Sequence, residues 1–201
     1  MHFLEKKTRE DKMFGSDKTF DVVYPPQIQL LAQRHWTPIA VAKKAAYFLG
    51  TEDNSKILDI GSGAGKFCLA AAHFKPKCMF YGVEQREGLN IEAEDAKQAL
   101  HIENAFFIHG NFTQIDFRKY DHFYFFNSFY ENLAGMEKID ESIEYSGELF
   151  NYYNQYLYHQ LEQKPAGTKL VTYHSLKDEV PKSYHVVYAQ MNDLLKYWIK
   201  I

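Results

Sequence analysis

A carboxylate followed by three alternating glycines is the arrangement in this chain best suited to hold a small ligand. Asp59 precedes Gly61 by two residues, and Gly63 and Gly65 follow. Glycine adopts positive φ without steric cost and lets a ligand approach the backbone closely. The apolar residues beside Asp59 predict a buried strand that ends in this glycine turn and opens a helix. Such a turn is typical of a cofactor site.

Two other glycine loops also join a strand to a helix, and the sequence departs from both. A P-loop requires a glycine five residues before Gly65, where this chain has Ile60. It also requires Ser or Thr after its lysine, where this chain has Phe67. The nicotinamide fingerprint requires its third glycine at position 66, and Asp59 would add negative charge near the pyrophosphate. A cofactor with a cationic end suits Asp59 better, which favours S-adenosylmethionine with its ammonium and sulfonium groups.

Polar side chains at the ends of two later strands predict a nucleoside site. Glu84 ends the apolar run 78–84 and can accept hydrogen bonds from both ribose hydroxyls. The run 105–109 is followed by Asn111 and Phe112, which offer an amide to the edge of adenine and a ring to its face. These residues predict a bound nucleoside, whether it belongs to NAD or to an adenosine cofactor.

Residues 57–65, 81–84 and 110–112 resemble successive motifs of the class I S-adenosylmethionine-dependent methyltransferases. In order and spacing the resemblance extends over residues 37–201. It implies that Glu84 holds the ribose and that Asn111, where the family more often has Asp, flanks the adenine. The cofactor-binding residues expected on this basis are Asp59, Gly61, Ser62, Gly63, Gly65, Glu84, Gln85, Asn111, Phe112, Asn127 and Thr37.

The methyl acceptor is expected at the end of the fourth strand, because ligands of open α/β sheets bind beyond the carboxyl ends of the strands. Asn127 and Tyr130 repeat the spacing of the Asn-Pro-Pro-Tyr motif of methyltransferases that act on planar amines. Ser128 and Phe129 replace the two prolines, so the rigid turn of that motif is missing. The Asn-x-Phe stretch also resembles the lysine methyltransferases of the histone type. These resemblances imply that Asn127 orients an amine and Tyr130 shields it, which makes both the candidate catalytic residues.

A dedicated base is optional, because positioning and the exclusion of water can carry most of methyl transfer. For a hydroxyl or thiol acceptor a base is more useful, and His109, Glu131 and His174 lie near predicted strand ends. His35 is expected to make local hydrogen bonds, since no His, Cys and Asp spacing indicates a metal site. We expect methyl transfer to a nucleophile, with a nitrogen on a protein or small molecule preferred. The alternatives are transfer to oxygen or another small-molecule nucleophile, and a non-catalytic S-adenosylmethionine-binding partner protein.

The elements that must position these residues alternate along the chain, which predicts a parallel sheet with helices on both faces. Strands are predicted at 56–60, 78–84, 105–109, 122–127 and 168–174, and helices at 38–49, 65–73, 88–101 and about 140–163. Residues 184–190 and 194–200 read as a hairpin around residues 191–193, with a short link at 175–183 before it. The predicted fold class is α/β, a Rossmann-like doubly wound, mostly parallel seven-stranded sheet with an antiparallel C-terminal hairpin strand.

The segment before the first strand admits two interpretations. Thr37 and Pro38 predict the start of a helix, with Thr37 as its N-cap and proline at the first helical position. Together with Trp36 they either cover the cofactor as a lid or form a hydrophobic staple on the helix.

Length and charge bound the remaining expectations. The 201 residues predict a single methyltransferase domain, with a loose N-terminal arm at 1–20, a helical cap at 21–50 and a catalytic core at 51–201. A formal charge of -3 and a pI near 6.3 give no general basic field, so strong nucleic-acid binding is not expected. Cys68 and Cys78 are expected to be buried thiols. A charged N-terminus and the lack of a membrane-length apolar run predict a cytoplasmic protein without membrane contact.

Overall fold

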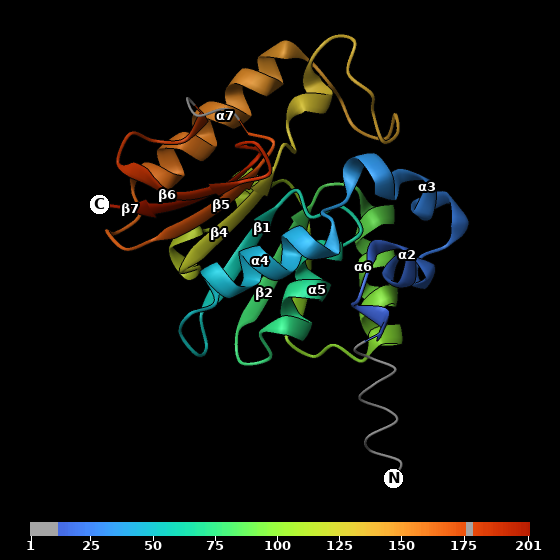
Figure 1. Ribbon diagram of the computed structural model, residues 1–201. Helices are drawn as coiled ribbons and strands as arrows, with labels where there is room; N and C mark the ends of the chain where they lie inside the picture. Colours follow the sequence, from blue (N-terminus) through green and yellow to red (C-terminus); the bar gives the residue numbers. More distant parts are fainter. Residues whose placement is uncertain (1–11, 176–178) are drawn as a thin grey trace.

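The computed structural model describes residues 12–175 and 179–201 of the chain. Within them seven strands form one sheet in the order β3-β2-β1-β4-β5-β7-β6 (Figure 1). The strands are β1 (Lys56–Ile60), β2 (Met79–Glu84), β3 (Ala105–His109), β4 (His122–Phe126), β5 (Lys169–Tyr173), β6 (Tyr184–Gln190) and β7 (Leu195–Lys200). The first five strands are parallel, and β7 runs antiparallel to both β5 and β6. The predicted fold class is confirmed.

Helices cover both faces of this sheet. They are α2 (Asp17–Phe20), α3 (Pro26–His35), α4 (Ile39–Leu49), α5 (Lys66–Phe74), α6 (Glu87–Leu100) and α7 (Gly147–Glu162). Alternate residues of β1 enter different cores, because successive side chains of a strand point to opposite faces. Ile57 packs in the core that α4, α5 and α6 form, whereas Leu58 and Ile60 pack in the core beneath α7. Figure 1 shows α4 and α5 on one side of the sheet and α7 on the other.

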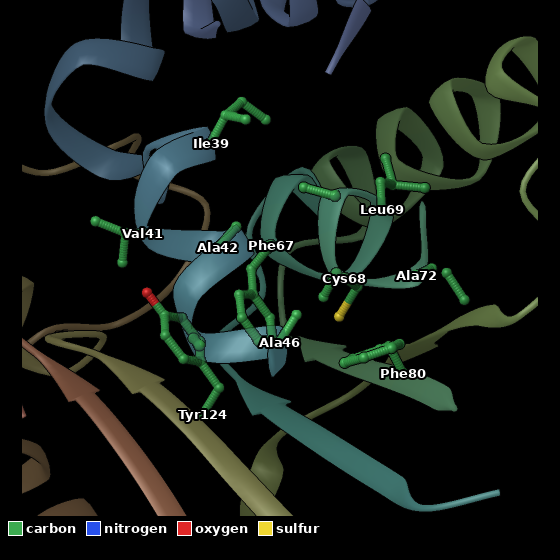
Figure 2. Close-up of a cluster of buried hydrophobic side chains, with 14 of the residues drawn as sticks. Ile39, Val41, Ala42, Ala46, Phe67, Cys68, Leu69, Ala72, Phe80 and Tyr124 are labelled. Carbon is green, nitrogen blue, oxygen red and sulfur yellow. The ribbon is translucent and has the colours of Figure 1, made fainter. Parts of the chain in front are cut away.

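The core that α4, α5 and α6 form, called the first core below, contains an aromatic stack between a helix and the sheet. The rings of Phe67 in α5 and Tyr124 in β4 lie parallel, with 3.7 Å between their centroids (Figure 2). Small side chains such as Ala42 and Ala46 allow helix α4 to approach the stack closely. The stack fixes the start of α5 against β4, so the glycine loop between β1 and α5 is held at both ends.

The N-terminal arm differs from the prediction in the part that the structure describes. Phe14 and Phe20 are buried against the first core, and Ser16 caps the short helix α2. The Asp17 carboxylate accepts a hydrogen bond from the Ile39 amide at 2.9 Å and so caps α4. The expectation of a loose arm was wrong for residues 12–20, because two phenylalanines anchor an otherwise charged stretch. Residues 1–11 lie outside the described residues.

Two helix starts also differ from the predictions. Pro38, not Thr37, occupies the N-cap position of α4, which begins at Ile39. The last helix, α7, begins at Gly147 rather than near residue 140, because the Ser146 hydroxyl accepts from the Leu149 amide at 3.1 Å and caps it there. The other predicted strands and helices agree with the structure to within one residue at either end. The link at 175–183 includes residues 176–178, which lie outside the described residues.

Candidate functional site

A pocket opens where the carboxyl ends of β1, β2, β3 and β4 meet at one edge of the sheet. Gly61 and Gly63 follow β1, Glu84 ends β2, Asn111 follows β3 and Asn127 follows β4. The strand order reverses between β1 and β4, which are adjacent in the sheet. Strands β2 and β3 lie on one side of this point and β5 lies on the other. Open α/β sheets bind their ligands at such a switch point.

The predicted site residues divide into two groups. Those that line the pocket are Gly61, Gly63, Glu84, Gln85, Asn111, Phe112, Asn127 and Tyr130. Asp59, Ser62, Gly65 and Thr37 lie outside its lining. Thr37 is buried, and its hydroxyl lies 3.0 Å from the hydroxyl of Tyr124, in a position that supports the core.

The glycine loop is shaped by protein side chains as well as by backbone angles. Gly61 and Gly63 have φ of +73° and +53°, which favour glycine. A Cβ at Gly61 would lie 2.5 Å from the Cβ of Ser128, and one at Gly63 would lie 2.2 Å from the Trp36 ring. Ser128 and Trp36 both line the pocket. A side chain at Gly61 or Gly63 would therefore displace a part of the pocket wall.

Asp59 lies behind the loop, on the face of β1 that packs against α5. Its side chain is buried, and Oδ2 accepts from the Cys68 thiol at a sulfur–oxygen distance of 3.7 Å. Burial raises the pKa of Asp59 well above its usual range, and the nearby Glu84 charge raises this pKa further. A buried carboxylate with a weak donor gains from a positive charge nearby, so the site fits a ligand with a cationic end. Direct contact between Asp59 and the cofactor stays a prediction.

Glu84 is held in one orientation beside the loop. Its Oε2 accepts from the Gly63 amide at 3.0 Å, and its Oε1 accepts from the Arg86 amide at 2.9 Å. Burial raises the pKa of Glu84, while the positive charge of Arg86 opposes that rise. Oε2 has a second lone pair left for a ribose hydroxyl. Oε1 also receives Arg86 Nη1 at the longer distance of 3.4 Å, so a second hydroxyl would have to replace that weak contact.

Asn111 makes hydrogen bonds different from those expected of it. Its Oδ1 accepts from the amide and the hydroxyl of Thr113 at 3.0 and 2.9 Å, and so caps the short helix that follows. Its Nδ2 donates to the Tyr153 hydroxyl at 2.8 Å and to Gln85 Oε1 at 3.3 Å. In this arrangement the amide oxygen, which could accept from an amine at the edge of adenine, already has two donors. The group that the amide offers toward the pocket residues Tyr153 and Gln85 is its NH₂.

The turn after β4 is held by hydrogen bonds although the two prolines are missing. The Ser128 hydroxyl donates to the Ile60 carbonyl at 2.7 Å, and the Tyr130 amide donates to the Asn127 carbonyl at 3.2 Å. Asn127 has φ of +49°, in the left-handed region that asparagine tolerates. Its Oδ1 is buried and has no hydrogen-bond partner in residues 12–175 and 179–201. In place of the two prolines, a serine side chain ties the turn to β1.

Tyr130 lines the pocket next to Asn127. Burial and the neighbouring Glu179 carboxylate raise the pKa of Tyr130 to about 12. Its ring meets that of Phe150 edge-on, with 5.6 Å between centroids. The side chain therefore stays neutral and supplies an apolar ring to the pocket at neutral pH.

Two of the four residues considered as bases or local hydrogen-bonding groups line the pocket. His109 and His174 lie outside the pocket lining. Glu131 lines the pocket, but its carboxylate accepts from the Arg86 guanidinium at 2.7 Å. His35 also lines it, and its Nε2 is buried without a partner in the described part of the chain. Burial lowers the pKa of His35, so its ring is neutral at neutral pH.

Arg86 is the pocket residue that sequence reasoning missed. Its guanidinium is buried and contacts the side chains of Glu84, Glu131, Asp140 and Tyr145. The available signal was an arginine placed two residues after the expected ribose carboxylate, in a stretch that is otherwise buried. Three of its partners are 45 or more residues away in the sequence, so the pattern alone did not reveal them.

The described residues hold neither a cluster of metal ligands nor a membrane span. No group of three or more His, Cys, Asp or Glu side chains there is placed to hold a metal ion. Neither is any helix among those residues both long and apolar enough to span a lipid bilayer.

The sequence is similar to known methyltransferases. A family model described as a methyltransferase domain matches residues 51–198. The chain is 43% identical over 54 residues to tRNA (guanine-N(7)-)-methyltransferase of Microcystis aeruginosa, a match that covers 27% of this chain and 26% of that protein. It is 29% identical over 107 residues to release factor glutamine methyltransferase of Buchnera aphidicola, covering 51% of this chain and 37% of that protein. The chain thus spans well under half the length of these curated relatives.

The fold has close counterparts among solved structures. An RNA methyltransferase from Salinibacter ruber, in complex with S-adenosyl-L-homocysteine, superposes with a TM-score of 0.54 and 18% identity. The superposition covers 82% of this chain and 92% of that one.

Proposed function

This chain belongs to the class I S-adenosylmethionine-dependent methyltransferases, and from that premise we propose that it transfers the methyl group to a nitrogen atom oriented by Asn127. The observation that carries the proposal is the unpartnered Oδ1 of Asn127 in the pocket wall. A buried acceptor without a donor is costly, and it is retained where a ligand supplies the missing hydrogen bond. An N–H of a planar amine or amide supplies that donor and leaves the nitrogen lone pair free for the methyl group.

The residues around Asn127 support this role. Its left-handed backbone is a strained conformation for most residues, and such strain is found where a side chain must be aimed at a ligand. Ser128 and the hydrogen-bonded turn hold it in place. Bound S-adenosylmethionine supplies a methyl group on a positively charged sulfur. The chain has to orient a neutral nitrogen, exclude water with the ring of Tyr130, and let one proton leave the product nitrogen.

Charge near the pocket mouth favours an acceptor on a protein or a small molecule over a nucleic acid. The acidic segment, residues 131–146, borders the pocket between β4 and α7. It carries Glu131, Glu137, Asp140, Glu141 and Glu144 against a single lysine, Lys138. Such a segment repels a phosphate backbone and attracts an amine. The two arginines of the pocket lining, Arg34 and Arg86, are paired with carboxylates of this segment, so they offer little free positive charge to the tRNA and RNA substrates named for two similar proteins.

The experiment is transfer of labelled methyl groups to fractionated cell extract. We expect label in material that protease or dialysis removes and RNase does not. The variant Asn127→Gly keeps the left-handed backbone and removes the amide, so turnover at saturating cofactor should fall by about a hundredfold. Asn151 is exposed on α7, and Asn151→Ala serves as the matched control. Full activity of Asn127→Gly, or label only in RNase-sensitive material, contradicts the proposal.

An oxygen acceptor is the second candidate, and His35 is the observation that favours it. Its neutral ring and unpartnered Nε2 in the pocket are suited to accept a hydroxyl proton. For an oxygen acceptor, His35→Gln should remove most of the turnover. The wild-type rate should also fall when the pH drops below the lowered pKa of the imidazole, because the protonated ring cannot accept a proton. For a nitrogen acceptor, His35→Gln should retain most of the rate.

A further inference from the structure

Arg86 is a buried cation shared by two parts of the molecule. It lies two residues after Glu84, at the start of α6, and 6% of its side chain is exposed. On one side its Nη1 lies 3.4 Å from Glu84 Oε1. On the other side its Nη2 donates to Glu131 at 2.7 Å and its Nε donates to Asp140 at 3.3 Å. A buried guanidinium needs such partners, because an unpaired buried charge is strongly destabilising.

The acidic segment is folded around this guanidinium. The Tyr145 hydroxyl accepts from Arg86 Nη2 at 2.7 Å and donates to the Asp140 carbonyl at 2.7 Å. The Glu131 carboxylate also accepts from the Ile139 amide at 2.9 Å. The two ends of the segment therefore meet at Arg86. In Figure 1 the segment is the long loop that leaves the end of β4 and passes near α3 before it enters α7.

The geometry makes the two sides compete for one cation. Arg86 lies closer to Glu131 than to Glu84, by 2.7 Å against 3.4 Å. If the acidic segment were displaced, Glu84 would be the carboxylate left beside the guanidinium. The long ion pair that Arg86 Nη1 already makes with Glu84 Oε1 would then shorten and compete with a ribose hydroxyl for that oxygen. The segment therefore keeps this ion pair weak and leaves Glu84 able to accept from the ribose.

We propose that Arg86 is a positioning residue that couples cofactor binding at Glu84 to the folding of the acidic segment over the acceptor end of the pocket. This inference rests on the cofactor site described above and not on the identity of the acceptor. Ribose hydroxyls that donate to Glu84 weaken its attraction for Arg86, which strengthens the hold of Arg86 on Glu131 and Asp140. Cofactor binding then tightens the wall against which the acceptor lies.

The test combines calorimetric titration with S-adenosyl-L-homocysteine and hydrogen–deuterium exchange of peptides from residues 131–146. The variants Asp140→Asn and Glu131→Gln each remove one charge that holds Arg86. Glu144→Gln removes a charge from the same segment at an exposed position and is the matched control. In the wild type, S-adenosyl-L-homocysteine should slow exchange across the segment. Asp140→Asn and Glu131→Gln should weaken its binding by about tenfold, within the range typical of coupled sites.

A double-mutant cycle separates coupling from simple loss of packing. In an Arg86→Gln background no cation competes for Glu84, so adding Asp140→Asn should leave the cofactor affinity unchanged. Thermal unfolding of each variant checks that the fold is retained. Equal affinities for Asp140→Asn, Glu131→Gln and Glu144→Gln would overturn the inference. So would an exchange rate in the segment that does not respond to S-adenosyl-L-homocysteine. These readouts contain no methyl acceptor, so a wrong assignment of the acceptor nitrogen does not affect them.

Discussion

Replacing Gly63 by alanine should destabilise the protein by about 2–5 kcal/mol, the sum of two separate costs. The first is backbone strain: at φ of +53° an alanine costs about 1–2 kcal/mol in the left-handed region. The second is a clash, because the new Cβ would lie 2.2 Å from Cζ3 of Trp36. Overpacking of this kind costs about 1–3 kcal/mol. The ring cannot simply move away, since Trp36 is buried and its Nε1 donates to the Ile28 carbonyl at 3.1 Å.

The assay is urea unfolding followed by fluorescence, with Gly88→Ala as the control. Gly88 lies in α6, and a Cβ added there would meet no atom within 4 Å, so alanine should stabilise the helix by up to about 1 kcal/mol. The double variant Gly63→Ala with Trp36→Ala separates the clash from the strain. Without the tryptophan ring the clash disappears, so the two changes together should cost about 1–3 kcal/mol less than their sum.

Two results would refute this reasoning. If Gly63→Ala unfolds at the same urea concentration as the wild type, neither the φ strain nor the clash operates. If the double variant is additive, the cost of Gly63→Ala arises elsewhere than at Trp36. In both cases the view that the N-terminal cap forms a wall of the cofactor pocket would lose its support.

Three further changes probe the same site. Burial raises the folded-state pKa of Asp59 above its unfolded value of roughly 3.9. The ligand-free protein should therefore lose stability as the pH rises through the folded-state pKa. Asp59→Asn should flatten the dependence of melting temperature on pH. Ser128→Ala removes the hydrogen bond to the Ile60 carbonyl and should cost about 1 kcal/mol in urea unfolding, with weaker binding of S-adenosyl-L-homocysteine. Glu84→Gln places an NH₂ group opposite one of the two backbone amides that now donate to the carboxylate, so calorimetry should show affinity at least about tenfold weaker.

The sheet could be predicted because its signals are local. Each strand of the parallel part is a short apolar run bounded by turn residues, and burial on both faces removes any need for alternation. The hairpin at the C-terminal end is equally visible in the sequence, since Asn192 and Asp193 are turn-forming residue types between two apolar runs. In the structure Met191, Asn192 and Asp193 adopt the left-handed backbone of such a turn. The residues that follow β1, β2, β3 and β4 then had to meet at one edge. This is why most of the predicted site residues line a single pocket.

The features that the sequence did not reveal share a different physical cause. The hydroxyl of Thr37 lies beside that of Tyr124, 87 positions away in the sequence, and contact of Thr37 with the cofactor stays a prediction. The start of α7 was placed too early because residues 140–146 have no helix breaker. Asp140 holds a tight turn through the Ser142 amide, and that turn depends on contact with Arg86. In each case a tertiary contact overrides a local preference, and a single sequence carries no record of that contact.

Arg86 shows why the missed residue matters more than the misplaced ones. A carboxylate alone at the end of β2 would bind ribose whether the pocket is open or closed. A cation beside it, shared with the acidic segment, makes the ribose site depend on a part of the chain that begins 45 positions away at Glu131. Because the same segment borders the place where Asn127 offers its unpartnered oxygen, cofactor and acceptor meet at one connected network of charges. From the proposed coupling we predict that the cofactor binds first, because its contact with Glu84 would free Arg86 to hold the acidic segment against the acceptor.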